Sequence, residues 1–112
     1  MNPQNPIHNQ IANDIKKYPV VVFMKGTKEA PLCGFSHTVV EIFKMLGAPI
    51  HSVDVLSDPT VRDGIKSYTN WPTIPQVFVK GEFIGGCDIT RDLFESGELE
   101  KKVKSALSPQ NS

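Results

Sequence analysis

Apolar residues recur at helical spacing in five segments of the chain, each with one apolar face. Pro19 ends the first segment, Gly47 ends the second as a left-handed cap, and Gly97 ends the fourth. Asp58 followed by Pro59 predicts the start of the third, and Asp88 is expected to cap the fourth. The apolar faces consist of Ile7, Ile11, Ile15 and Tyr18; Val39, Val40, Phe43 and Leu46; Val61, Ile65 and Tyr68; Ile89 and Leu93; and Leu99, Val103 and Ala106.

Four shorter segments between these helices have the composition of strands. Residues 20–24 form a continuous β-branched and aromatic run, which is typical of a strand buried on both faces. Residues 50–55 predict a short second strand. Residues 77–79 and 83–84, separated by Lys80-Gly81, predict a hairpin with a two-residue turn.

The resulting order is α-β-α-β-α-β-β-α-α. A strand–helix–strand unit followed by a hairpin predicts a mixed sheet of about four strands with helices on both faces, which is a thioredoxin-like α/β architecture. With 112 residues we expect a single domain, 1–112, with an ordered core at about 7–107 and polar flexible ends.

Composition narrows the possible functions. Twelve basic residues balance twelve acidic ones, which argues against bulk electrostatic binding to nucleic acid or to membranes, and no apolar run is long enough to cross a bilayer. The chain has two cysteines, too few for a disulfide framework or for a four-ligand metal site within one chain. A reducing compartment is therefore expected.

Cys33 is the leading candidate for chemistry. It lies between Pro31 and Gly34, at the junction of a loop and the second predicted helix. Unpaired N–H groups at a helix N-terminus favour a thiolate, and Lys25 could add a positive charge nearby. The alternative is a small buried apolar side chain.

The second position of a Cys-x-x-Cys redox pair is occupied here by Ser36, in Cys33-Gly34-Phe35-Ser36. A serine cannot resolve a mixed disulfide, which excludes intramolecular dithiol chemistry at this motif. Three interpretations stay open: a monothiol exchange catalyst, a thiolate that holds a metal or cluster with outside ligands, and a redox-inert module.

Further candidates follow in the second half of the chain. Pro75 comes just before a predicted strand and would be the cis proline of a thioredoxin-like fold. Gly85-Gly86-Cys87-Asp88 could present free N–H groups to a carboxylate, although a tight strand-to-helix turn explains the glycines equally well. Cys87 is either a second thiol or a packing residue.

Basic and aromatic residues have two interpretations as well. Arg62 and Lys66 lie four residues apart on one helix face. They are either solvated surface charges or part of a groove wall that binds a peptide carboxylate. Trp71 is expected to pack in the core or to form a groove wall. His37 follows Cys33 by four residues, but two ligands are too few for zinc, so an exposed histidine is expected.

Four blocks together resemble the monothiol glutaredoxins of the Cys-Gly-Phe-Ser type. The resemblance extends from about Ile11 to Leu107. The chain looks like the single-domain class of this family and is similar to the mitochondrial member and its bacterial relatives. The blocks are residues 23–27 (Phe-Met-Lys-Gly-Thr), 31–36 (Pro-Leu-Cys-Gly-Phe-Ser), 70–77 (Asn-Trp-Pro-Thr-Ile-Pro-Gln-Val) and 85–88 (Gly-Gly-Cys-Asp).

This resemblance implies glutathione binding at nine positions. Cys33 would face the glutathione sulfur. The glycine carboxylate of glutathione would be bound by Lys25, Arg62 and Lys66. Its peptide backbone would pair with Thr73 and Ile74, beside cis Pro75. Its γ-glutamyl end would be held by Cys87 and Asp88, with Asp88 opposite the amino group.

The resemblance also implies a 2Fe–2S cluster held between two protomers, with one Cys33 and one glutathione thiolate from each side. The expected function is a glutathione-ligated homodimer that passes clusters to apo iron–sulfur recipient proteins and works with assembly factors. The alternatives are a monothiol oxidoreductase that deglutathionylates proteins, and a redox-inert adaptor.

The expected compartment is the mitochondrial matrix, after removal of a transit peptide, or alternatively the bacterial cytoplasm. Residues 1–10 contain neither Arg nor Lys and no apolar segment, which is not the pattern of a secretory signal or an Arg-rich transit peptide.

Overall fold

The computed structural model describes residues 5–108, so the outermost residues of the two predicted flexible ends, 1–4 and 109–112, lie outside the described part. The elements follow the predicted order. They are α1 (Pro6–Lys17), β1 (Val20–Met24), α2 (Gly34–Met45), β2 (His51–Asp54), α3 (Pro59–Thr69), β3 (Gln76–Val79), β4 (Glu82–Gly85), α4 (Cys87–Ser96) and α5 (Glu98–Leu107).

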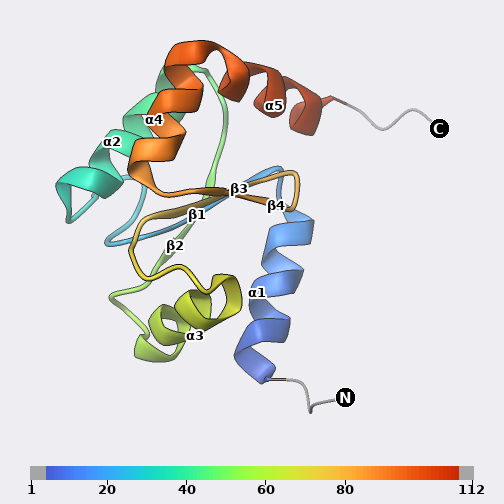
Figure 1. Cartoon of the computed structure of the whole chain (residues 1–112). Helices are drawn as coiled ribbons and strands as arrows, with labels where there is room; N and C mark the ends of the chain where they lie inside the picture. The colour runs from blue at the N-terminus through green and yellow to red at the C-terminus, as the bar shows by residue number, and fades with distance from the viewer. Residues whose placement is uncertain (1–4, 109–112) are drawn as a thin grey trace.

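The four strands form one mixed sheet in the order β2-β1-β3-β4. β1 pairs with β2 in parallel, and the β1–β3 and β3–β4 pairs are antiparallel. Helices α1 and α3 lie on one face of the sheet, and α2, α4 and α5 lie on the other (Figure 1). The predicted thioredoxin-like α/β fold is therefore confirmed.

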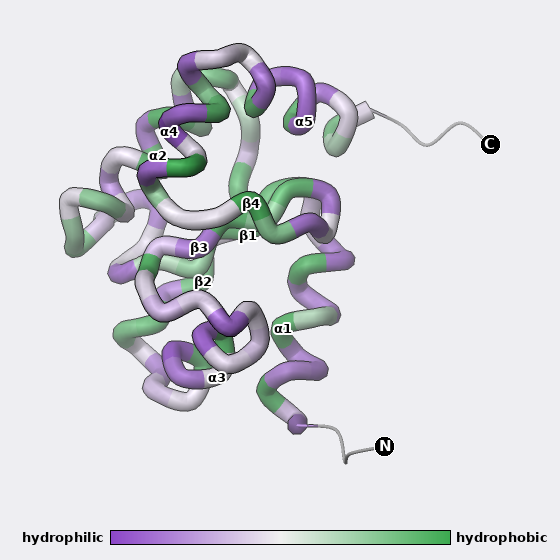
Figure 2. Tube along the Cα trace, viewed as in Figure 1, coloured by the Kyte–Doolittle hydropathy of each residue, from purple (hydrophilic) through white to green (hydrophobic). Residues whose placement is uncertain are grey.

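β1 is buried along its whole length because it contributes to both cores. Val20, Val22 and Met24 pack with α2, α4 and α5, whereas Val21 and Phe23 pack with α1 and α3. Side chains alternate between the faces of a strand, so a strand covered on both faces must be apolar at every position. Figure 2 shows the apolar stretches gathered around the sheet, with polar residues on the outer sides of the helices.

The turn and cap predictions hold at three places. The Asp58 carboxylate accepts a hydrogen bond from the Thr60 N–H at 2.9 Å, with Pro59 in the first turn of α3. Gly47 has φ +67° after α2. Lys80 and Gly81 both have positive φ, as a tight hairpin turn requires. No helix within residues 5–108 is both long and apolar enough to span a membrane.

Two local predictions are wrong. Asp88 does not cap α4: the helix begins at Cys87, and the cap position falls on Gly86, which has no side chain. Tyr18 is not helical, because the residue before a proline is disfavoured in the α region. It is extended after α1, and its ring stacks on His51 with centroids 3.8 Å apart.

Candidate functional site

Cys33 lies where the loop after β1 enters α2. It is the N-cap residue of α2, with extended backbone, and its side chain makes no capping hydrogen bond. The loop is tied back to β1 because the Leu32 N–H donates to the Lys25 carbonyl at 3.0 Å. Gly26 has φ +84°, and a Cβ there would lie 2.5 Å from the Ala30 carbonyl oxygen, so this turn requires glycine. The thiol is thus held at the carboxyl end of β1.

Ser36 does more than replace a second thiol. It is fully buried, and its hydroxyl accepts a hydrogen bond from the Lys25 N–H at 3.2 Å. Its N–H and hydroxyl also lower the pKa of the Cys33 thiol. Ser36 therefore connects β1, α2 and the thiol, a role that the sequence motif alone did not reveal.

The pKa of the Cys33 thiol is lowered, as its position predicts. The largest cause is the polar backbone N–H of Ser36, whose effect partial burial opposes. The Phe35 N–H and the Ser36 hydroxyl lower the pKa further, and the charge of Lys25 contributes least of the named causes. Activation of this thiol therefore comes mainly from donors at the start of α2.

Cys87 is the first residue of α4 and is only 8% exposed. Burial raises its pKa, and the charges of Asp88 and Cys33 raise it further, while Arg91 opposes them. Both cysteines are free thiols. Cys87 packs in the core shared by α2, α4 and α5 and also reaches the cavity described next.

A cavity of about 530 Å³ brings all nine predicted site residues together. It opens between the start of α2, helix α3, the loop before β3 and the start of α4. The nine are Lys25, Cys33, Arg62, Lys66, Thr73, Ile74, Pro75, Cys87 and Asp88.

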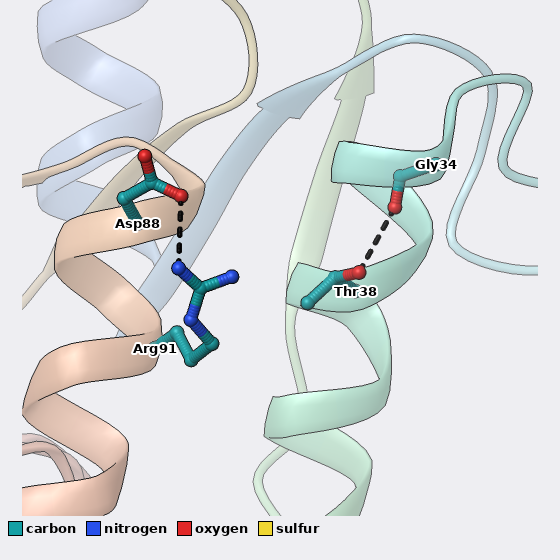
Figure 3. A network of polar contacts seen from close by, with 4 residues as sticks. All are labelled: Gly34, Thr38, Asp88 and Arg91. Atoms are coloured by element: carbon teal, nitrogen blue, oxygen red, sulfur yellow. Dashed lines mark hydrogen bonds and ion pairs between the residues drawn. The ribbon is translucent and has the colours of Figure 1, made fainter.

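Charge is distributed unevenly around this cavity. Arg62 and Lys66 come from α3 and Lys25 follows β1, whereas Asp88 comes from the start of α4, and α3 and α4 lie on opposite faces of the sheet (Figure 1). Asp88 is paired with Arg91 at 3.1 Å, on the side of α4 that faces α2 (Figure 3). Such a cavity suits a ligand with carboxylates at one end and an ammonium group at the other.

Gln76 shapes the wall formed by residues 71–75. Its fully buried amide donates to the carbonyls of Trp71 and Thr73 at 3.0 and 3.2 Å, and its carbonyl accepts from the Thr69 hydroxyl at 2.8 Å. The Ile74–Pro75 peptide bond is cis, as predicted. The only sequence signal for the role of Gln76 was a polar residue at the start of an apolar strand.

Five further residues line the cavity: Phe35, Trp71, Pro72, Gly86 and Ile89. Trp71 forms a cavity wall, one of the two roles considered for it. Phe35 is 63% exposed at the rim, and Ile89, expected on an apolar helix face, is 39% exposed there. A Cβ on Gly86 would lie 3.3 Å from the Pro75 carbonyl oxygen, so a glycine lets α4 begin close to this wall. His37 is exposed, as expected.

Fold and site together define a thioredoxin-like protein with one activated thiol at the mouth of a charged cavity. The glutaredoxin family profile matches residues 20–84. The "uncharacterized monothiol glutaredoxin ycf64-like" protein of Synechocystis is 51% identical over 108 residues, which is 96% of this chain and 99% of that protein. The solution structure of reduced poplar apo GrxS14 has a TM-score of 0.79 and 48% identity, covering 88% of this chain and 91% of that one.

The chain therefore belongs to the glutaredoxin family, in its monothiol branch. The mitochondrial monothiol glutaredoxin-S15 of Arabidopsis thaliana is 44% identical over 90% of this chain, which spans 60% of that protein. The relatives include bacterial, chloroplast and mitochondrial proteins. The chain spans about half the length of the chloroplast relatives from rice and Arabidopsis thaliana, which are 55% and 51% covered.

Proposed function

We propose that this protein carries 2Fe–2S clusters in a glutathione-dependent way, with the cluster as its cargo. The observation that carries the proposal is Cys33 itself. Its thiol has a lowered pKa, opens onto a cavity that suits a zwitterionic peptide, and has a serine where a resolving thiol would stand. A thiolate without a resolving partner is suited to binding an iron or a second sulfur species from outside the chain.

Glutathione is the ligand proposed for the cavity. Lys25, Arg62 and Lys66 would bind its glycine carboxylate, and Asp88 its ammonium group, because these opposite charges line the same cavity. Thr73 and Ile74, before Pro75, would pair with the tripeptide backbone. Cys87 and the free N–H groups at the start of α4 would receive the γ-glutamyl end. The glutathione sulfur would then lie beside Cys33.

Ligand counting makes the proposed carrier a dimer. Within residues 5–108 no group of three or more His, Cys, Asp or Glu side chains could hold a metal ion. A 2Fe–2S cluster takes four ligands, and each protomer would supply its Cys33 thiolate and one bound glutathione thiolate. Two protomers complete the set. Because half of the ligands are exchangeable small molecules, the cluster is expected to be labile, as transfer to an apo iron–sulfur protein requires.

Monothiol oxidoreductase activity is the second candidate, favoured by the lowered Cys33 pKa. In that reaction the Cys33 thiolate attacks the glutathione sulfur of a protein–glutathione disulfide, and the protein leaves as its thiolate. A second glutathione thiolate then attacks the glutathione sulfur of the Cys33 mixed disulfide. This step releases oxidised glutathione and regenerates Cys33.

A reducing compartment is proposed for either activity, since both need Cys33 as a free thiolate. The mitochondrial matrix is the proposed compartment, and the bacterial cytoplasm is the alternative. The relatives include proteins of both kinds. The proposed protein partners are a second copy of this chain, assembly factors and apo iron–sulfur recipients.

Anaerobic reconstitution with iron and sulfide, with and without glutathione, tests the proposal. Visible absorbance and mass in solution should show a cluster-bound dimer only when glutathione is present. Cys33→Ser should abolish the cluster, and the matched Cys87→Ser variant should largely retain it. A stable cluster formed without any added thiol, or one that persists in Cys33→Ser, would contradict the mechanism. Robust turnover of a glutathionylated substrate without any cluster would favour the oxidoreductase.

A further inference from the structure

Among residues 5–108, Asp88 is the one acidic residue that lines the cavity, and it already has a partner within its own helix. Asp88 lies in the first turn of α4, and Arg91 lies one turn later. The Arg91 Nη2 is 3.1 Å from the Asp88 Oδ1. Figure 3 shows the Arg91 side chain running back along α4 toward this carboxylate, while the other carboxylate oxygen points away from it. Arg91 itself does not line the cavity.

We propose that Arg91 competes with the ammonium group of glutathione for the Asp88 carboxylate, and so limits how much that ammonium contributes to binding. The inference rests on the proposed glutathione site. It makes Arg91 a positioning residue that acts through Asp88.

Solvent exposure makes this competition reversible. The Asp88 and Arg91 side chains are 79% and 47% exposed, so water screens their attraction and the pair opens readily. An ammonium group that reaches Asp88 either displaces the guanidinium or shares the carboxylate with it. In both cases the carboxylate attracts the ammonium less than an unpaired one would, because part of its charge is already balanced.

Two effects of opposite sign act on the overall affinity, so affinity alone cannot test the proposal. Glutathione carries a net negative charge, and loss of the Arg91 cation removes some long-range attraction for it. The same loss frees Asp88 for the ammonium. The contribution of the ammonium must therefore be measured separately, by comparing glutathione with N-acetylglutathione, which lacks that charge.

The proposal has a consequence for cluster transfer. Glutathione that is held less tightly at its γ-glutamyl end exchanges more readily, and a carrier with exchangeable ligands releases its cargo more readily. Arg91 would thus keep the proposed cluster labile without contacting it.

The test is calorimetry of the apo-protein with glutathione and with N-acetylglutathione. The measured quantity is the dissociation constant of N-acetylglutathione divided by that of glutathione, in which effects common to both ligands cancel. Moderate salt screens the long-range effect of the one-unit difference in charge between the ligands. Arg91→Met retains the length of the side chain and removes its charge. We expect the ratio to rise about two- to fivefold over the wild type, the range typical of an exposed ion pair. In an Asp88→Asn background the same substitution should leave the ratio unchanged.

Lys101→Met is the matched control. Lys101 forms an i,i+3 pair with Glu98 on α5, outside the cavity, so its loss changes the net charge equally and should leave the ratio at the wild-type value. An unchanged or lower ratio in Arg91→Met overturns the inference, as does a rise that persists with Asp88→Asn. If the wild type binds neither ligand, the proposed glutathione site itself is wrong.

Discussion

Cys33 and Cys87 stand at the starts of two helices and face the same cavity, yet folding moves their pKa values in opposite directions. Cys33 is the N-cap of α2, and the backbone N–H groups of Phe35 and Ser36 in the first turn lower the pKa of its thiol. Cys87 comes one position later relative to its helix, as the first residue of α4, and no backbone donor is among the causes of its shift.

Burial adds to this difference. Cys87 is packed in the core and next to the Asp88 carboxylate, and both disfavour the thiolate. Cys33 is only partly buried, and its donors outweigh the cost of burial. In this protein the cysteine at the N-cap position is the activated one, whereas the cysteine in the first turn of α4 is not, although it also lies at a helix N-terminus.

The largest expected effect is on alkylation. At pH 7 Cys33 should react with iodoacetamide on the order of a hundredfold faster than Cys87, because the lowered pKa supplies thiolate and the buried thiol is shielded. The Cys33 rate should level off below the pH range of an ordinary thiol, since its pKa is lowered. The Cys87 rate should still rise above that range, since its pKa is raised.

Mass spectrometry of the Cys33→Ser and Cys87→Ser variants, each with one thiol, measures the two profiles separately. Similar midpoints for the two thiols would remove the distinction between cap and first-turn positions.

Ser36→Ala should have the next largest effect. It removes a hydroxyl that lowers the pKa of Cys33 and leaves the Lys25 N–H without its acceptor. We expect the alkylation midpoint of Cys33 to rise only in part, because the backbone donor of residue 36 remains. Loss of the buried acceptor should lower the free energy of unfolding by about 1–3 kcal/mol.

Denaturant unfolding and the alkylation profile measure both effects. Thr38→Val is the matched control in α2, since its hydroxyl donates only to the Gly34 carbonyl within the helix (Figure 3). A Ser36→Ala protein as stable as Thr38→Val, with an unshifted midpoint, would show that Ser36 only fills space.

The spacing of apolar residues predicted the fold well, because which side chains are buried determines that spacing. The β1 run had to be apolar on both faces, and Asp58-Pro59 and Lys80-Gly81 had to be a cap and a turn. The helix-start position of Cys33 likewise indicated the direction of its pKa shift. Local sequence could not specify which polar groups pair. The Ser36 link joins α2 to β1. The Gln76 bonds to the cavity wall and the Asp88–Arg91 pair join residues that are near one another in the sequence, but those partners become evident only once the turn and the helix start have folded.

Thr90 offers a smaller test on the Cys87 side. It lies one turn after Cys87, is fully buried, and its hydroxyl has no hydrogen-bond partner. Thr90→Val replaces that hydroxyl by a methyl group of similar shape, which removes the cost of an unpaired buried group. We expect the free energy of unfolding to rise by about 1 kcal/mol in denaturant titrations, with the Cys87 alkylation profile unchanged. A loss of stability would mean that the hydroxyl is paired in solution, and that the surroundings of Cys87 are less apolar than its raised pKa implies.

The smallest effect is expected for the charge of Lys25, which the sequence suggested as an addition to the helix-start position of Cys33. Lys25→Met removes the weakest named cause of the lowered pKa and leaves the Lys25 N–H bond to Ser36 intact. The alkylation midpoint of Cys33 should therefore rise by less than in Ser36→Ala. The rate at pH 7 should change by about twofold or less, with the difference shrinking as salt is added.

Lys44→Met is the control of equal charge, because Lys44 pairs with Glu41 on the last turns of α2, far from the thiol in sequence and outside the cavity. A shift in Lys25→Met that equals or exceeds the one in Ser36→Ala would place the origin of the Cys33 activation in the cation, and the helix-cap explanation of the difference between the two cysteines would fail.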